Sequence, residues 1–431
     1  MNLLFNSFTS TRMAQCLAVI CGLSAVNVMA EDYAATPLDE LKPLLAIDWK
    51  LGPDYPMGIQ DSTVGIIDNH LVSAGGYSAY PLDVVKTYPD TFGDKPHGFT
   101  KLALSLDLAK QPGEWKRIDD MPGPARQGPA VAVVDDVIYA MGGMNFDEPH
   151  HAYADTYRLE RRDGAWQWHD LPATTGSGHE RKVCRLPWPV YGGSGSTAVI
   201  GKKIYLVGCA DYFRGPGGEG LALHSEAGRA GSPVGSALLV FDTTRPEEGW
   251  KRLADCPGVP KLHGSLAAVG GKIYQLGGAF CPLAFKSATD GQNSYNAVDS
   301  WRYDPETDEW TRLRDMPDGG TRRAVVYDDR YIVMCGGFKF PETWHVDGQV
   351  TPAWVGPERE LGFNDFFLDA VLVYDTVTER LGTSNRMIEK TSWPGGVIQG
   401  DTIYCLGGEG GPRLYHPATL QIGKIVKVIE E

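Results

Sequence analysis

Short apolar runs alternate along this chain with turns rich in Gly, Asp and Asn. In each repeating unit, one apolar run, a turn and a second apolar run end in a doublet of small residues. The turns, such as Asp135-Asp136 and Gly270-Gly271, suit the positive φ of tight hairpins. The unit occurs six times, over residues 64–76, 130–143, 196–209, 265–278, 323–337 and 395–408. The pattern therefore predicts six β-hairpins.

A second half follows most of the doublets. An aromatic or Leu residue leads to a Trp and then to a Pro, as in Tyr303, Trp310 and Pro317. The corresponding Trp in the second unit is Trp166 or Trp168, and in the fifth unit Leu381 stands in its place. Each unit is thus predicted to hold four strands, with the Trp on the fourth. Six such sheets bury both their faces when they pack radially.

With these residues the chain resembles the kelch-repeat β-propellers. The matching doublets are Gly75-Gly76, Gly142-Gly143, Gly277-Gly278, Gly336-Gly337 and Gly407-Gly408, and the third unit departs with Gly208-Cys209. The resemblance covers nearly all of residues 31–431. It implies an all-β fold, a six-bladed kelch-type β-propeller of four-stranded antiparallel blades, in a single domain.

The sixth unit has no Trp of its own, so its outer strand must come from elsewhere. Trp49-Lys50-Leu51, near the N-terminus, has the pattern of an outer Trp strand. Residues 422–428 are the alternative for the same place. The Trp favours closure by the N-terminal strand.

The first 30 residues have the pattern of a signal peptide. Arg12 precedes an apolar stretch over 13–28, and Val28-Met29-Ala30 has the residue types of a cleavage site before Glu31. We therefore expect residues 1–30 to be removed and residues 31–431 to form a periplasmic or secreted protein. No later stretch reaches 18 consecutive apolar residues, so no membrane anchor is expected.

Charge and cysteine content narrow the classes of partner. The formal net charge of −14, from 54 acidic and 40 basic residues, argues against binding to nucleic acid. The cysteines lack zinc-site spacing and no phosphate-binding Gly motif precedes a helix, so neither metal nor cofactor is expected. Cys335 and Cys405 lie in apolar runs and are predicted to be buried thiols. A disulfide among Cys184, Cys209 and Cys281 suits an oxidising compartment, with the pairing open.

The long insertions point to the functional face. The kelch resemblance implies that loops joining the second and third strands share one face with the loops between blades. All the long insertions belong to these two classes, and residues such as Gln60-Asp61 and Gln127 lead into blades near the axis. Arg, acids, His and Trp together suit an acidic sugar. The candidate substrate-binding residues are Arg126, His150, Glu226, Arg229, His263, Arg322, Arg323, Trp344 and His345.

The closest functional resemblance is to exported bacterial sialic acid mutarotases (N-acetylneuraminate epimerases). That resemblance implies a Glu and an Arg that open and reclose a sugar ring by proton transfer. Glu409 and Arg413 follow the sixth doublet in the matching order, and Asp211 and Arg214 follow the third. These four are the candidate catalytic residues. The expected function is mutarotation or epimerisation, an isomerase reaction, of sialic acid or a related acidic sugar.

Two other functions compete with this one. The same face suits a non-catalytic propeller that binds glycans or proteins. It also suits a polysaccharide lyase or hydrolase, which needs two carboxylates at a set separation. The sequence leaves the choice open, as it does the oligomeric state.

Overall fold

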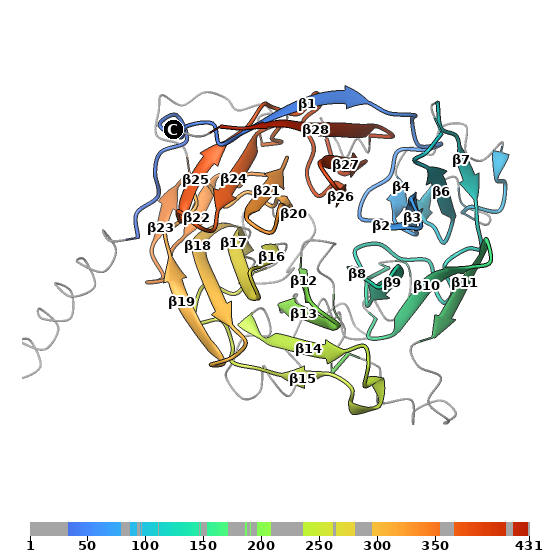
Figure 1. Cartoon of the computed structure of the whole chain (residues 1–431), viewed down its shortest axis with the longest axis horizontal. Helices are drawn as coiled ribbons and strands as arrows, with labels where there is room; N and C mark the ends of the chain where they lie inside the picture. Colours follow the sequence, from blue (N-terminus) through green and yellow to red (C-terminus); the bar gives the residue numbers. More distant parts are fainter. Residues whose placement is uncertain are drawn as a thin grey trace, which may run out of the picture.

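The computed structural model contains six antiparallel sheets that stand radially around one axis (Figure 1). This confirms the predicted all-β, six-bladed kelch propeller. The signal-like segment and Cys184, Cys209 and Cys281 lie outside the residues that the structure describes. The described residues are 33–78, 87–92, 95, 97–110, 112–145, 147, 153–170, 186–187, 190, 196–207, 236–261, 264–280, 295–353, 366–410 and 417–429.

Within each of the first three blades the strands follow the chain from the axis outward. Blade one holds β2 (Thr63–Ile67), β3 (His70–Ala74), β6 (Ala103–Asp107) and β7 (Trp115–Arg117). Blade two holds β8 (Ala130–Val134), β9 (Val137–Met141), β10 (Thr156–Arg162) and β11 (Ala165–Asp170). Blade three holds β12 (Thr197–Ile200), β13 (Lys203–Val207), β14 (Leu238–Asp242) and β15 (Lys251–Arg252), with a 3-10 turn η4 (Pro246–Glu248) before β15.

The next two blades keep this order, whereas the sixth combines the two ends of the chain. Blade four holds β16 (Ser265–Val269), β17 (Lys272–Phe280), β18 (Tyr295–Asp304) and β19 (Glu309–Leu313). Blade five holds β20 (Arg323–Tyr327), β21 (Tyr331–Cys335), β24 (Val371–Asp375) and β25 (Arg380–Thr383). Blade six holds β26 (Gly395–Gln399), β27 (Thr402–Leu406), β28 (Leu420–Val428) and, outermost, β1 (Leu45–Leu51).

The N-terminal strand closes the ring, as its Trp predicted. Trp49 on β1 lies opposite Gly423 on β28, so the C-terminal strand is third in its blade and not outermost. A Cβ on Gly423 would lie 2.8 Å from the Trp49 ring, so the glycine leaves room for the indole. The indole Nε1–H of Trp49 donates to the carbonyl of Asn385, which precedes blade six.

Trp residues on other outer strands also donate hydrogen bonds to loops between blades. The indole N–H donates to a backbone oxygen at 3.2 Å for Trp115 with Pro53, 2.8 Å for Trp168 with Asp119 and 2.9 Å for Trp310 with Ala254. These bonds identify Trp168, and not Trp166, as the equivalent residue of blade two. Leu381 lies opposite Tyr374 in blade five and fills the Trp position without a donor.

A backbone hydrogen bond joins neighbouring blades at every described doublet. The second glycine donates its N–H to a carbonyl in the loop that leads into the next blade. The donor–acceptor pairs are Gly76 with Arg126, Gly143 with Val190, Gly278 with Gly319 and Gly337 with Thr391, all 2.7 Å, and Gly408 with Ile59 at 2.8 Å. Both glycines of each of these doublets have positive φ.

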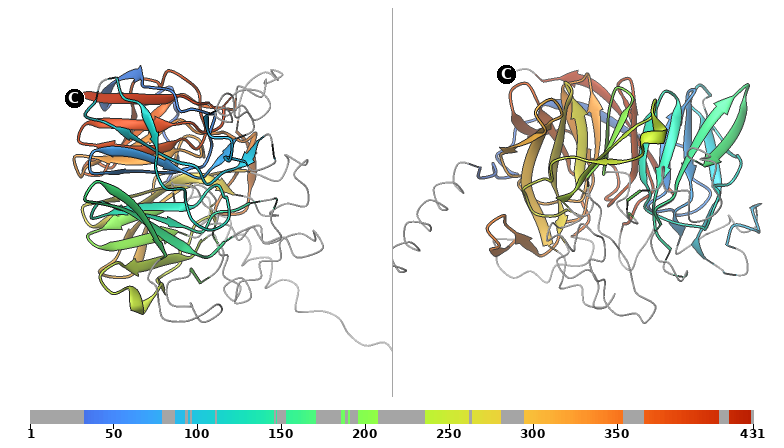
Figure 2. Two further views of the ribbon diagram at one scale, coloured as in Figure 1. Left: turned by 90° about the vertical axis from the view of Figure 1, so that its right-hand side faces the viewer. Right: turned by 90° about the horizontal axis from the view of Figure 1, so that it is seen from below.

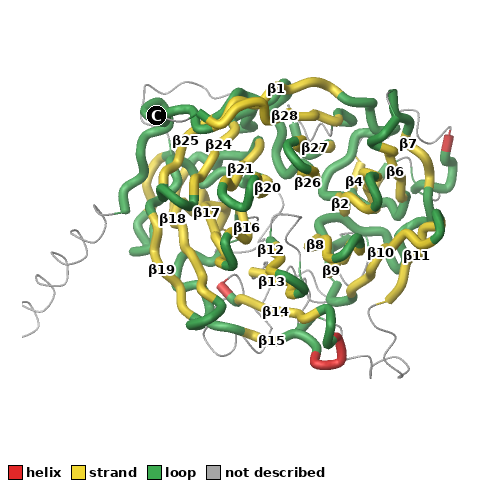
Figure 3. Tube along the Cα trace, in the orientation of Figure 1, coloured by secondary structure: helices red, strands yellow, loops and turns green. Residues whose placement is uncertain are grey.

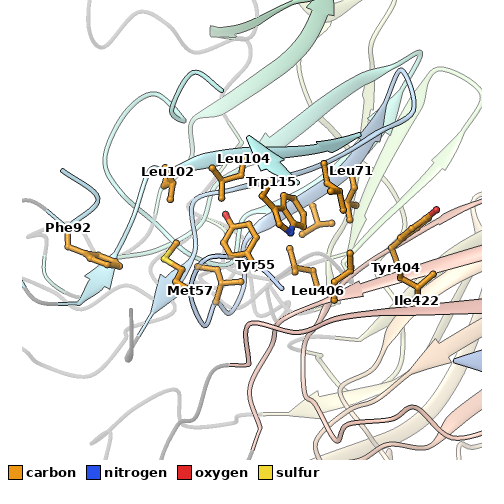
Figure 4. Packing of buried hydrophobic residues seen from close by; sticks show 14 residues of the cluster. Tyr55, Met57, Leu71, Phe92, Leu102, Leu104, Trp115, Tyr404, Leu406 and Ile422 are labelled. Atoms are coloured by element: carbon orange, nitrogen blue, oxygen red, sulfur yellow. The ribbon is translucent and has the colours of Figure 1, made fainter. Parts of the chain in front are cut away.

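Apolar side chains fill the space between neighbouring blades. In β27, Cys405 and its alternate neighbour Ile403 face blade five, whereas Leu406 faces blade one. The cluster between blades six and one includes Tyr55, which meets Trp115 edge to face with 5.0 Å between ring centroids (Figure 4). Cys335 and Cys405 are both buried, as predicted. The core is therefore a series of layers between blades.

Two insertions add short strands on one face of the disc (Figure 2). β4 (Tyr77–Ser78) pairs with β5 (Gly98–Phe99) inside the insertion of blade one. β22 (Glu342–Trp344) and β23 (Val350–Pro352) form a hairpin from blade five, and β22 pairs with β18 of blade four. Blade four is thereby wider than the predicted four strands. Strands and short loops account for nearly all of the described chain (Figure 3).

No helix within the described ranges is long and apolar enough to cross a membrane.

The doublet geometry predicts a position-specific cost of adding a methyl group. Gly407 and Gly400 lie in the same blade with φ of 60° and 59°. A Cβ at Gly407 would overlap the carbonyl oxygen of Ile59, whereas a Cβ at Gly400 has open space. Gly400→Ala should lower the free energy of unfolding by about 1 kcal/mol, because Ala is strained at positive φ. Gly407→Ala should cost at least about 2 kcal/mol more, measured by urea unfolding. Equal losses would contradict the role assigned to the close approach.

Candidate functional site

The residue after each doublet lies beside a loop that leads into a blade near the axis. Tyr77 pairs with Gln60, Met144 pairs with Gln127, and Glu409 pairs with Ser392. In blades four and five the corresponding residues are Ala279 and Phe338. Glu409 is thus the one carboxylate among the described members of this ring of positions, and it lies on the face that carries the insertions.

The seam between blades six and one fixes Glu409. Gly408 donates to the carbonyl of Ile59, and the backbones of Glu409 and Ser392 exchange hydrogen bonds of 2.8 and 2.7 Å. Gln60 and Asp61 follow Ile59 directly, and the side chain of Gln60 hydrogen-bonds the Glu409 carboxyl. Residues from the two ends of the chain therefore meet here.

Burial changes the acidity of Glu409. Its side chain is partly buried, and desolvation is the main cause that raises its pKa from 4.5 to about 8. The negative charge of Asp61 raises the pKa further, while the hydrogen bond from Gln60 opposes the rise. A carboxyl that titrates near neutral pH suits proton transfer in either direction.

Amide groups form the adjoining wall. Gln60 donates from Nε2 to Oε1 of Gln127 at 3.2 Å, and both side chains are buried. The Oε1 atom of Gln60 is buried and has no hydrogen-bond partner among the described residues. A buried acceptor of this kind costs free energy unless a donor reaches it. The wall thus holds one buried acceptor that no described group satisfies.

A cationic region adjoins the same face at blade five. Arg322 forms a buried ion pair with Asp318, with 3.1 Å between Nη2 and Oδ2. Lys339 lies near both, and burial lowers its pKa. Thr321 connects this region to blade six, because its hydroxyl lies 3.3 Å from that of Ser392. Lys339 was missed by sequence reasoning, although it lies only two residues after a doublet.

Two further predicted binding arginines are also held by protein groups. The side chain of Arg126 is fully buried, where it pairs with Asp155 at 2.7 Å and lies 4.2 Å from the Tyr153 ring centroid. Arg323 donates from Nε to the carbonyl of Gly396 at 2.7 Å, across the seam of blades five and six. Burial lowers the pKa of Arg323 to about 10. Both guanidinium groups thus join neighbouring segments of the ring.

Trp344 and His345 lie apart from Glu409, on the hairpin at the outer side of β18 (Figure 1). Trp344 contacts Phe280 and Tyr295, with ring-centroid distances of 5.2 and 5.3 Å. His345 Nε2 lies 2.8 Å from the hydroxyl of Thr351. Trp344 therefore packs beside the residue that follows Ala279, in blade four, whereas Glu409 belongs to blade six.

The other candidates lie outside the described residues. They are Arg413, Asp211, Arg214, His150, Glu226, Arg229 and His263. Of the predicted site residues, the structure brings Arg322 to the face near Glu409 and adds Gln60, Asp61 and Lys339. The described residues contain no group of three or more His, Cys, Asp or Glu that could hold a metal ion.

Comparison with known proteins gives the propeller its relatives. No protein-family profile matches the chain. The chain is 24% identical to N-acetylneuraminate epimerase of Haemophilus influenzae over 315 residues, which cover 67% of this chain and 71% of that protein. It is 27% identical to Kelch-like protein 15 of Danio rerio over 237 residues, which cover 52% of this chain and 32% of that protein. This chain is a kelch propeller that resembles the N-acetylneuraminate epimerases.

Further comparisons extend the likeness of this kelch propeller. N-acetylneuraminate epimerase of Salmonella typhimurium is 22% identical over 321 residues, covering 70% of this chain and 77% of that protein. The solved structure of YjhT matches with a TM-score of 0.54 and 14% identity, covering 86% of this chain and 97% of that one. At this identity the structural match shows the fold alone. The match to Kelch-like protein 15 spans about a third of that relative's length.

The raised pKa of Glu409 predicts a pH-dependent stability. The folded kelch propeller binds this proton more tightly than the unfolded chain, so its free energy of unfolding should fall as pH rises from 4.5 to about 8. The free energy of unfolding should fall by about 2 kcal/mol. This is less than the value that corresponds to the whole pKa shift, because the carboxyl is partly exposed and solvent screens its charge. In Glu409→Gln this component of the fall should be absent. The prediction would be contradicted if the free energy of unfolding changed equally between pH 4 and pH 9 in the wild type and in Glu409→Gln.

The ion pair of Arg126 predicts a second stability effect. Asp155→Asn would leave a fully buried guanidinium without its counter-charge, so it should cost about 3 kcal/mol in thermal or urea unfolding. Asp369→Asn is the matched control, since its partner Arg386 is 70% exposed, and should cost under about 1 kcal/mol. A small loss at Asp155 would mean that Arg126 is free to serve a ligand.

Proposed function

We propose that this kelch propeller is a mutarotase or epimerase that acts on sialic acid or a related acidic sugar. The observation that carries the proposal is Glu409, a carboxyl that titrates near neutral pH on the insertion-bearing face. The names of the epimerase relatives support the choice of sugar. The export pattern of residues 1–30 supports a periplasmic or secreted site of action.

The chemistry needs one acid and one base. Opening the ring breaks the bond between the anomeric carbon and the ring oxygen, while a base takes the anomeric hydroxyl proton and an acid gives a proton to the ring oxygen. Reclosure on the other face of the carbonyl reverses both transfers, so no proton is gained or lost. Glu409 in its protonated form supplies the acid near neutral pH.

Recognition of the sugar carboxylate needs local positive charge, since the whole chain is acidic. Arg413, four residues after Glu409, is the proposed cation on the same loop. Lys339 adds positive charge at blade five. The remaining loop candidates, Asp211 and Arg214 with His150, Glu226, Arg229 and His263, are proposed to complete the site from blades two to four.

A second candidate function is a non-catalytic propeller that binds glycans or proteins. Kelch-like protein 15 matches half of this chain. In that function Glu409 and Gln60 would bind a ligand without turning it over. Two separate assays would detect the other enzyme classes: unsaturated uronate absorbance for a lyase and released reducing ends for a hydrolase.

Anomer equilibration of free sialic acid, followed by NMR at pH 7, tests the proposed function. The wild-type protein should speed the exchange of anomers, and Glu409→Gln should lower that rate at least about 100-fold, because the transferable proton is lost. Glu306→Gln is the control, since Glu306 is exposed in the β18–β19 turn, and it should behave as wild type.

Two outcomes would reject the mutarotase. Wild-type protein that leaves the exchange at the rate of buffer would do so directly. If calorimetry showed that the wild type and both variants bind the sugar, and none of the three turned it over, the binding propeller would be favoured instead.

A further inference from the structure

Two cysteines face each other across the seam between blades five and six, which are neighbours in the ring (Figure 1). In blade five, β20 pairs with β21 so that Arg323 lies opposite Cys335. In blade six, β26 pairs with β27 so that Gly396 lies opposite Cys405. Directly opposite residues of an antiparallel pair point to the same side of their sheet. Each cysteine therefore shares one face of its blade with its cross-strand partner.

Arg323 and Gly396 show how closely these two faces approach. A Cβ on Gly396 would lie 2.3 Å from Cγ and 3.2 Å from Cβ of Arg323. Arg323 also donates from Nε to the carbonyl of Gly396 at 2.7 Å. The two blades are thus in direct contact along their innermost strands. Cys335 and Cys405 occupy the next row outward, on β21 and β27.

The two thiols meet in this row. Cys335 and Cys405 belong to one buried apolar cluster and are 0% and 1% exposed. A hydrogen bond joins the two thiols, and this bond together with burial raises the pKa of the Cys335 thiol above its ordinary value. Of the three cysteines that the structure describes, Cys256 lies in another part of the ring, in the loop between β15 and β16.

We propose that Cys335 and Cys405 form a modification site, a dithiol that an oxidising disulfide compound converts into a disulfide between blades five and six. Two thiols that already share a hydrogen bond need only a further approach of their sulfurs to reach the S–S distance of about 2 Å. The signal-like pattern of residues 1–30 predicts a compartment in which such bonds form and persist. This site goes beyond the proposed function, and neither depends on the other.

The exchange conserves atoms and electrons. One thiol of the pair loses its proton and attacks a sulfur of the oxidant disulfide, which releases one thiol of the oxidant. The second thiol of the pair loses its proton and attacks the mixed disulfide, which releases the other thiol of the oxidant. The pair loses two electrons and two protons in total. The oxidant disulfide gains them and becomes two thiols.

Burial decides when the bond forms. The thiolate is the attacking species, and an oxidant must reach one of the two sulfurs. In the folded kelch propeller both sulfurs are buried, and the raised pKa of Cys335 keeps its thiol protonated. Oxidation therefore takes place while the chain folds, before the seam closes, and is slow in the folded protein. The same burial protects the finished disulfide from reductants.

Refolding of the reduced protein with oxidised and reduced glutathione tests the site. Trypsin cleaves after Lys and Arg, so peptide 331–339 holds Cys335 and peptide 391–413 holds Cys405. After alkylation of the remaining thiols and digestion without reductant, mass spectrometry should find these two peptides joined. Folded, reduced protein in the same glutathione mixture should form this link at least about tenfold more slowly, because its thiols are protected.

Stability distinguishes a disulfide from a simple contact. Oxidation should raise the urea midpoint of the wild type by at least about 0.5 M more than that of Cys335→Ala or Cys405→Ala, since a cross-link restricts the unfolded chain. Cys256→Ala, which removes another buried cysteine, is the matched control and should behave as wild type. Each variant is compared with its own reduced form, so packing lost at the substituted position cancels. The two alanine variants also serve as substitutes for each other if one fails to fold.

Three results would overturn the proposal. The first is the absence of the link between peptides 331–339 and 391–413 after refolding. The second is a Cys335 that is joined to a cysteine other than Cys405. The third is an oxidation-dependent rise of the urea midpoint that is equal in the wild type, Cys335→Ala and Cys405→Ala.

Discussion

The bond between the second glycine of a doublet and the next blade's leading loop sets the geometry of the whole ring. The second glycine donates its N–H, and a Cβ on the first would strike the same carbonyl oxygen that accepts this bond, as at Ile59, Val190 and Thr391. The doublet therefore serves two needs at once, close approach of two backbones and positive φ at both positions. Because the bond recurs at the same place, each blade meets its neighbour at a fixed height.

The same bond also fixes the position of the residue that follows each doublet. The residue that follows each doublet is placed beside the loop of its own blade and next to the loop of the following one. In four of the five described blades this residue is aromatic, sulfur-containing or apolar, and in blade six it is Glu409. The seam that holds Glu409 is also the one at which residues from the two ends of the chain meet. Ring closure and the candidate acid therefore share one seam.

The repeat could be predicted because it is local. A doublet and a Trp recur at similar spacing, and the missing Trp of the sixth blade pointed to Trp49. Contacts between distant segments could not be predicted in the same way. Arg126 and Asp155 are separated by a whole hairpin, and Asp61 and Glu409 by nearly the entire chain. Arg126 therefore looked available to a sugar, while Asp61 was only a residue near the axis. The pairing of β22 with β18 of another blade had no sequence signal.

Electrostatics connects the composition to the site. A chain with 14 more acids than bases would repel an anionic sugar unless cations gather locally or acids near the sugar hold protons. Two of the predicted arginines, Arg126 and Arg323, are used to join segments of the ring, which leaves fewer cations for a ligand. Burial of Glu409 acts in the other direction, because a carboxyl with a pKa near 8 is mostly neutral at pH 7. The same desolvation that makes this acid a proton donor thus also lowers the charge that an acidic sugar would meet.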